Sequence, residues 1–224
     1  MVMSFFRRDD SVGLEAITAR TVSMLADARH SFDLASTAVL SGADVRTVAD
    51  DIRATDDRIN RTEQQLRGEL VVHVSVQGSD DIGEVLGFTL LIKKIERIGD
   101  QAKNILDLAE EGIDLSSAPD SGELTRIRRM ISEMMGEAAD FLSGTGAGDA
   151  NEFRERTDTL GAELAAKISD CMHSELPGYE VVPRAILYRY WKRIIANVGG
   201  VVTTATEPLQ HQGYLDDGQT DIDD

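Results

Sequence analysis

The chain has 224 residues, enough to bury a substantial hydrophobic core in one domain or two. Its 40 acidic residues outnumber its 23 basic ones, and a formal net charge of −17 repels the phosphates of nucleic acids and the headgroups of anionic lipids. We therefore expect no nucleic-acid partner. We also expect no direct membrane insertion, because no apolar run reaches the roughly 18 residues that a membrane-spanning helix needs.

Residue usage indicates a reducing compartment and a helical fold. The single cysteine, Cys171, cannot form an intramolecular disulfide, and the N-terminal sequence does not combine a basic start with a long apolar run. We therefore expect a cytoplasmic protein. Four prolines and 5% aromatic residues, in a chain rich in alanine, leucine and charged residues, favour helix over sheet.

Three long helices are predicted in the first half of the chain. Apolar or small residues recur at helical spacing from Leu14 to Val39, from Val45 to Leu70 and from Ile82 to Ala109. Asp44 is placed to cap the second helix. The β-branched run VVHVSV, residues 71–76, would suit a strand, but a lone strand has nothing to pair with. We therefore interpret this run as the end of the second helix.

The plan repeats in the second half. A segment rich in glycine, proline and serine, residues 110–122, is typical of a loop. Helical patterns follow over 123–142, 151–175 and 181–206, with the glycine-rich turn SGTGAGD between the first two. The predicted fold is all-α, with six long helices in two tandem three-helix bundles. The expected domains are a first repeat over 10–112, a second repeat over 123–212 and an acidic, disordered tail over 213–224.

Carboxylates are paired at helical spacing in the first repeat. In KKIERIGDQAKN, residues 93–104, Glu96 and Asp100 lie one turn apart on the third helix, and Asp56, Asn60 and Glu63 share one face of the second. Like charges at this spacing repel, so the face either points to water or lies against a cation. Gly99, between the acidic pair, indicates close approach of a neighbouring helix.

Two such faces turned toward each other would make an oxygen-only ligand set. Oxygen ligands suit magnesium, manganese, calcium or iron, whereas zinc normally takes cysteine or histidine. The expected cofactor is thus a divalent or trivalent metal bound by carboxylates. A solvated acidic face is the alternative, and spacing alone leaves both open.

The run IERIGDQAKNI resembles the signature of the PhoU family of phosphate-uptake regulators, whose repeats carry an E-x-x-x-D motif in the third helix. The segment TDDRINRTE, residues 55–63, is similar to the second-helix pattern of that family. The resemblance covers nearly the whole chain as two three-helix repeats. It implies an intracellular, all-helical protein with metal ligands Asp56, Glu63, Glu96 and Asp100 and outer-shell residues Asn60 and Asn104.

The resemblance also implies a function and partners. Members of the family act between a phosphate ABC transporter and a phosphate-sensing histidine kinase, so the expected partners are the transporter ATPase and the kinase. An accessory role on an ion-coupled phosphate carrier is an alternative. The identity of the metal and the oligomeric state, with a homodimer among the options, are left open.

The second repeat departs from the acidic motif. When the last helix is aligned on the third, Lys192 falls opposite Glu96 and Ala196 opposite Asp100. A basic cluster with aromatic neighbours stands there instead, and we expect it to bind an acidic partner through Arg189, Trp191, Lys192 and Arg193. Salt bridges to the preceding helix are the alternative use of these cations.

Catalysis is not expected. The sequence has no Ser-His-Asp ordering, no G-x-x-x-x-G-K loop and no E-x-x-H pair for a di-iron site. We interpret the chain as a PhoU-like regulator that acts by protein contact. A metal-dependent enzyme or a metal-storage bundle on the same acidic faces is the alternative.

Overall fold

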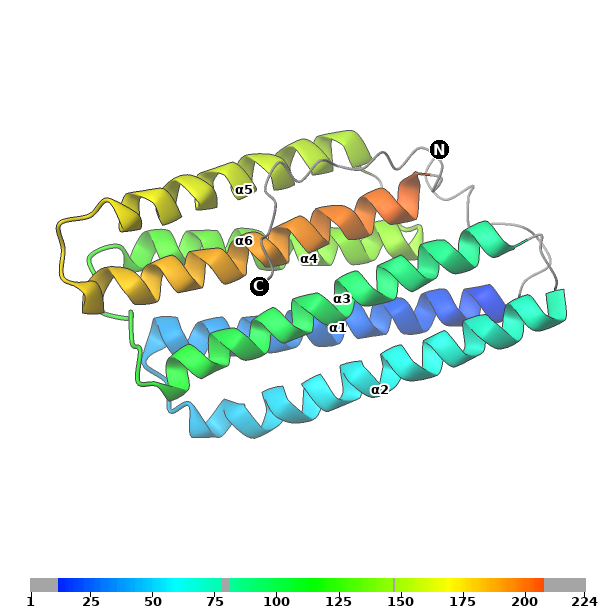
Figure 1. Cartoon of the computed structure of the whole chain (residues 1–224), viewed down its shortest axis with the longest axis horizontal. Helices are drawn as coiled ribbons and strands as arrows, with labels where there is room; N and C mark the ends of the chain where they lie inside the picture. Colours follow the sequence, from blue (N-terminus) through cyan, green and yellow to red (C-terminus); the bar gives the residue numbers. More distant parts are fainter. Residues whose placement is uncertain (1–11, 78–80, 147, 208–224) are drawn as a thin grey trace.

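The part of the chain described by a computed structural model, residues 12–77, 81–146 and 148–207, consists of six α-helices and contains no strand (Figure 1). The prediction of an all-α protein with six long helices is confirmed. The helices are α1 (Val12–Ser41), α2 (Arg46–Gln77), α3 (Ile82–Glu110), α4 (Ser121–Ser143), α5 (Ala150–Met172) and α6 (Gly178–Thr206).

Two details of the helix ends bear on the sequence predictions. The run VVHVSV lies inside α2, as predicted. Helix α6 begins at Gly178, earlier than predicted, and includes Pro183. Pro183 is the sixth residue of α6 and has no N–H to donate to the carbonyl of Tyr179 four residues earlier, so the helix loses one hydrogen bond near its start. The predicted acidic tail over 213–224 lies outside the described residues.

The six helices form one layered bundle. Figure 1 shows α2 along one long edge and α5 along the opposite edge, with the other four helices between them. Helices α1 and α3 pack on each other. Across the repeats, α1 packs on α4, and α3 packs on α6. Each repeat therefore contributes to one continuous core rather than closing on itself.

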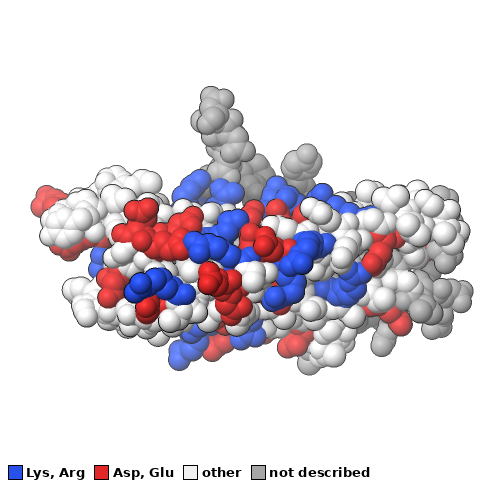
Figure 2. Space-filling model, turned by 90° about the horizontal axis from the view of Figure 1, so that it is seen from below, with Lys and Arg blue, Asp and Glu red and all other residues white. Residues whose placement is uncertain are grey.

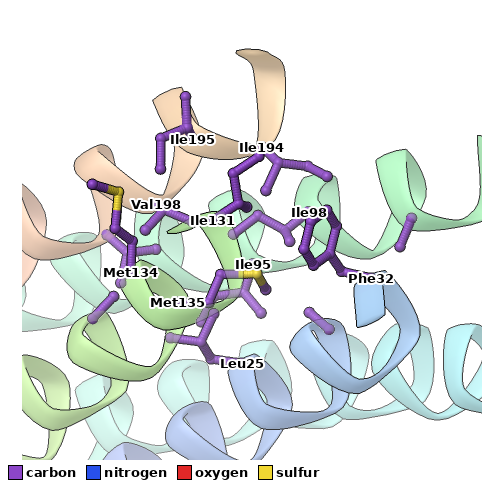
Figure 3. Packing of buried hydrophobic residues seen from close by; sticks show 14 of the residues in the cluster. Leu25, Phe32, Ile95, Ile98, Ile131, Met134, Met135, Ile194, Ile195 and Val198 are labelled. Atoms are coloured by element: carbon purple, nitrogen blue, oxygen red, sulfur yellow. The ribbon is translucent and has the colours of Figure 1, made fainter. Parts of the chain in front are cut away.

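Large apolar side chains from four helices meet in the middle of this core. Figure 3 shows Leu25 and Phe32 of α1, Ile95 and Ile98 of α3, Ile131, Met134 and Met135 of α4, and Ile194, Ile195 and Val198 of α6 converging there. All of these residues are buried. This contact fixes how the two repeats lie relative to each other.

A polar cluster also joins the repeats. Asp33 of α1 forms an ion pair of 3.0 Å with Arg128 of α4 and accepts a hydrogen bond of 3.0 Å from Ser132. Arg29 of α1 donates to the Ser132 hydroxyl at 3.0 Å. The direction of these bonds sets the rotation of α4 against α1, which apolar packing alone specifies less sharply.

The α2 side of the molecule has no single sign of charge. In Figure 2, which looks onto this side, acidic and basic residues alternate over the middle of the surface. Uncharged surface lies toward both ends of this view. The exposed Val71, Val72 and Val76 belong to the last two turns of α2. Among the described residues, every helix is too short or too polar to cross a lipid bilayer.

An ion pair closes the second repeat and gives a testable pH dependence. Arg184 of α6 donates two hydrogen bonds, of 2.9 and 2.8 Å, to the two carboxylate oxygens of Asp120, just before α4. These bonds lower the pKa of the Asp120 carboxyl against the opposing effect of burial. We expect Asp120→Asn to lower the free energy of unfolding at neutral pH by about 1 kcal/mol.

The sign follows from proton binding. Because the folded pKa is depressed, the unfolded chain binds more protons in acid, so the stabilisation is present above the usual aspartate value of about 3.9 and disappears as the pH falls through the folded pKa. Urea unfolding at neutral pH and at several acidic pH values measures this. Asp50→Asn, at an exposed position that forms no ion pair with the part of the chain described here, is the control. A deficit that stays constant into acid would contradict the assignment.

Candidate functional site

The predicted metal ligands lie along the contact between α2 and α3. Asp56 and Glu63 of α2 are buried, with 9% and 8% of their surface exposed, and Glu96 and Asp100 of α3 are half-buried. We call these four residues the acidic face. Ile59, on the same side of α2, is buried against Gly99, where an added Cβ would lie 3.0 Å from Ile59 Cδ1. The absence of a side chain at Gly99 thus lets the Ile59 side chain of α2 approach the backbone of α3 closely, as the position of the glycine indicated.

Two lysines that were not predicted to belong to the site lie on the acidic face. Lys93 Nζ is 2.7 Å from Glu96 Oε2 and 4.0 Å from Glu63 Oε1, so one ammonium group joins the two helices. Lys103 Nζ is 3.1 Å from Asp56 Oδ2. Each lysine stands three residues from a motif carboxylate, a spacing that places both on the same helix face. This spacing could have predicted from the sequence that the two lysines lie on the acidic face.

The carboxylates of the face have nearby cations, but two of their oxygens have no hydrogen bond. Arg67 Nη2 lies 2.8 Å from Glu63 Oε1, and Lys93 contacts Glu96 as above. The angles of these contacts do not make hydrogen bonds, so Glu63 Oε1 and Glu96 Oε2 are buried without a hydrogen-bond partner. Buried carboxylate oxygens in this state attract a further cation or donor.

The pKa values on the face are shifted in the directions expected for closely spaced carboxylates. Burial raises the pKa of Asp100, and repulsion from Glu96 and then Asp56 adds to the rise. The pKa of the Lys103 ammonium is raised by its hydrogen bond to Asp56. The carboxylates are therefore close enough to influence each other across α2 and α3, as the sequence predicted.

The predicted outer-shell residues have weaker contacts. Asn60 Nδ2 donates to Asp56 Oδ2 at 3.5 Å, the outer limit of a hydrogen bond. Asn104 is half-buried on α3, one position beyond Lys103. Both stand beside the acidic face, and their role in holding a ligand stays a prediction.

The donor chemistry of the face fits a hard metal ion, but the side chains as placed do not form a ligand set. Among the described residues, no group of three or more histidine, cysteine, aspartate or glutamate side chains is arranged to hold a metal ion. The ammonium groups of Lys93 and Lys103 contact the carboxylate oxygens that a shared metal ion would have to bind. A metal could bind here only in exchange for these ammonium groups.

The predicted partner-binding cluster on α6 is divided between surface and core. Arg189 and Arg193 are exposed and Lys192 is half-buried. Trp191 is 0% exposed and packs edge to face on Tyr188, with ring centroids 6.1 Å apart. The prediction that Trp191 belongs to the contact surface is wrong, because a partner cannot reach a fully buried ring. The role of the three cations stays a prediction.

The second repeat has a small hollow where the first has its acidic face. It measures about 190 Å³ and lies between α5 and α6. Arg154, Asp158 and Gly161 of α5 and Lys192 and Ala196 of α6 line it. In the alignment of the last helix on the third, Lys192 and Ala196 stand at the positions of Glu96 and Asp100. The α6 wall of the hollow therefore lacks both carboxylates of the motif.

Fold and site together define a helical protein of two three-helix repeats, of which only the first carries an acidic face between its second and third helices. Residues 21–109 match the sequence model of the PhoU domain. The match contains the whole acidic face. The predicted resemblance to the PhoU family is confirmed for this span, which makes up most of the first repeat.

A solved structure agrees with this assignment at the level of the fold. The structure is similar to the crystal structure of PhoU from Pseudomonas aeruginosa, with a TM-score of 0.70 and 19% sequence identity over 86% of this chain and 95% of that one. At this identity the likeness shows a shared fold. No curated protein sequence matches the chain.

Proposed function

We propose that the protein is a cytoplasmic regulator of phosphate uptake and phosphate signalling that acts by binding other proteins and catalyses no reaction. The observation that carries this proposal is the PhoU-domain match over residues 21–109, which includes all four carboxylates of the acidic face. The partners proposed are the ATPase of a phosphate ABC transporter and a phosphate-sensing histidine kinase. The alternative partner is an ion-coupled phosphate carrier.

The exposed cations of α6 are the proposed contact surface for such a partner. Arg189 and Arg193 are one helical turn apart and both are exposed, which places two guanidinium groups side by side. In a chain of net charge −17, this local excess of positive charge would orient an acidic partner toward α6.

A pull-down against the cytoplasmic domains of the transporter ATPase, the kinase and the carrier tests this surface. We expect Arg189→Glu with Arg193→Glu to reduce capture at least about tenfold in low salt, because like charges then face each other. Capture by the wild type should also weaken as the Debye length falls from about 10 Å at 0.1 M salt to about 3 Å at 1 M.

The matched control changes two exposed arginines elsewhere, Arg46→Glu with Arg61→Glu, and has the same net charge. Both variants are first shown to unfold like the wild type. Equal capture by the wild type and the α6 variant would move the contact to another surface. If the wild type captured none of the candidate partners, the proposed function would be refuted.

The acidic face is the proposed site of a divalent or trivalent metal, with Asp56, Glu63, Glu96 and Asp100 as the residues that would hold it. The four oxygen donors and the two buried oxygens without hydrogen bonds support this assignment. Bound there, the ion would tie α2 to α3. Asn60 and Asn104 would orient the carboxylates.

A further inference from the structure

A groove separates α4 and α5 in the second repeat. Both helices pack closely on α6, and α1 and α2 pack closely on each other at the equivalent place in the first repeat. Helices α4 and α5 instead meet through long side chains, in the ion pairs Arg156–Glu137 and Arg126–Glu163, and through the Phe141 and Phe153 rings, whose centroids are 5.5 Å apart. The opening between α4 and α5 is a groove of about 430 Å³. The asymmetry between the repeats is the first sign that this face has a use of its own.

The floor of the groove is apolar and its walls are acidic. Met134 and Leu160, 5% and 1% exposed, and the half-buried Met130 form the floor. Methionine side chains are flexible and adapt to different apolar partners. The walls carry one lining arginine, Arg156, against five glutamates, namely Glu133, Glu137, Glu152, Glu155 and Glu163.

The protein neutralises three of these five glutamates. Glu137 pairs with Arg156, Glu163 with Arg126, and Glu133 with Arg129 of its own helix. Glu152 and Glu155, near the start of α5, form no ion pair among the described residues. Two glutamates without an ion pair, beside the partly exposed Met130, favour a ligand that brings both positive charge and apolar surface.

We infer that the α4–α5 groove is a docking site for a cationic amphipathic helix of a partner protein. Such a helix places one apolar face in a groove through residues spaced three and four apart, here against the partly exposed Met130, with the buried Met134 and Leu160 beneath it. Its lysines and arginines would flank that face and meet the glutamates of the walls. The inference rests on the proposed action by protein contact and gives it a second surface, of opposite charge to that on α6.

Two other occupants carry too little positive charge. A second copy of the chain brings a net charge of −17, which repels it from an acidic groove. Residues 1–11 of the same chain, MVMSFFRRDDS, hold two arginines and two aspartates and offer no net charge. A cationic helix from another protein satisfies both the apolar floor and the acidic walls.

The test uses a synthetic helical peptide as the probe and the full chain as the target. The peptide is capped at both ends, about five helical turns long, and built of leucine on one face and lysine on the others. One control peptide has glutamate in place of lysine, and another has the leucine and lysine order scrambled. We expect the methyl signals of Met130 and Met134 in NMR spectra of methionine-labelled protein to shift with the first peptide, while those of Met24 and Met172 stay in place.

Matched charge variants separate the groove from the general acidity of the protein. We expect Glu152→Lys with Glu155→Lys to weaken peptide binding at least about tenfold, because two attractions become repulsions. Asp50→Lys with Glu175→Lys changes two exposed acidic residues outside the groove and alters net charge equally, so its effect should stay below about twofold at 0.1 M salt. Met130→Gln should weaken binding by reducing the apolar floor.

Several results would overturn the inference. One is equal binding of the lysine peptide by the wild type and the groove variant. Another is binding of a control peptide as tight as that of the lysine peptide. The third is a lysine peptide that leaves the Met130 and Met134 signals in place. A shift of those signals on deletion of residues 1–11 without peptide would assign the groove to the chain itself, and dimerisation lost in the groove variant would assign it to a second copy. Peptide binding needs none of the phosphate-system proteins, so a failed pull-down with intact peptide binding removes the proposed function and leaves the groove.

Discussion

Replacement of Trp191 by alanine is expected to lower the free energy of unfolding by about 3–5 kcal/mol, the usual range for truncating a large buried aromatic side chain. Trp191 is the largest of the fully buried side chains and has no exposed surface. It contacts Tyr188 edge to face, in the centre of α6. Urea unfolding followed by far-ultraviolet circular dichroism measures the loss, because the variant lacks the only tryptophan in the chain.

Two further variants make the Trp191 result specific. Trp191→Phe keeps a ring in place and removes an indole N–H that is buried without a hydrogen-bond partner, so its loss should be clearly smaller. Tyr179→Ala, at a side chain that is 78% exposed on the same helix, should change stability by less than about 0.5 kcal/mol. If Trp191→Ala were as stable as Tyr179→Ala, the ring would lie at the surface, and its place in a contact site would be restored.

Loss of metal binding in Glu96→Gln with Asp100→Asn is the second large effect expected. The double substitution keeps the shape of both side chains and removes two of the four proposed charged ligands, so loading with manganese, iron, magnesium or calcium should fall to background. Titration calorimetry and elemental analysis of protein purified without an affinity tag measure this. An iron-oxidation assay on the same samples separates a structural metal from a storage or enzymatic one.

Substitution of the two lysines is expected to change metal affinity in the opposite direction. Lys93 and Lys103 compete with any metal for Glu96, Glu63 and Asp56, so Lys93→Gln with Lys103→Gln should bind metal more tightly than the wild type. Lys192→Ala, in the second repeat, should leave loading unchanged. Metal retained by the Glu96 and Asp100 double variant would refute the ligand assignment. No binding by the wild type or by the lysine variant would leave the two lysines as the permanent counter-ions of the face.

Elements that depend on local spacing were predictable from the sequence. Apolar residues at three- and four-residue intervals predicted α1, α2 and α3, and the end of α2 through VVHVSV, because helical periodicity is a property of neighbouring residues. The same rule placed Asp56 and Glu63 on one face of α2 and Glu96 and Asp100 on one face of α3. The motif ERIGD predicted the resemblance to the PhoU family, and the match of residues 21–109 to the PhoU domain confirmed that resemblance for the first repeat.

The burial of Trp191 shows where sequence reasoning stopped short. Tyr188, Trp191, Ile195 and Val198 follow each other at helical spacing and are all buried, whereas Arg189 and Arg193 form a separate exposed row. Reading residues 188–193 as one cluster mixed these two sides of the helix. The spacing held the information that separates them.

The sequence by itself determined which residues form helices, which stripe of each helix is apolar and which repeat carries the carboxylates. Only the tertiary structure decided which stripes meet: α1 with α4 and α3 with α6 across the repeats, Lys93 and Lys103 against the acidic face, and a groove between α4 and α5. The reason is physical. An apolar stripe lowers its free energy against any apolar partner of suitable shape, so periodicity fixes that a face is buried, while the choice of neighbour depends on the packing of all six helices together.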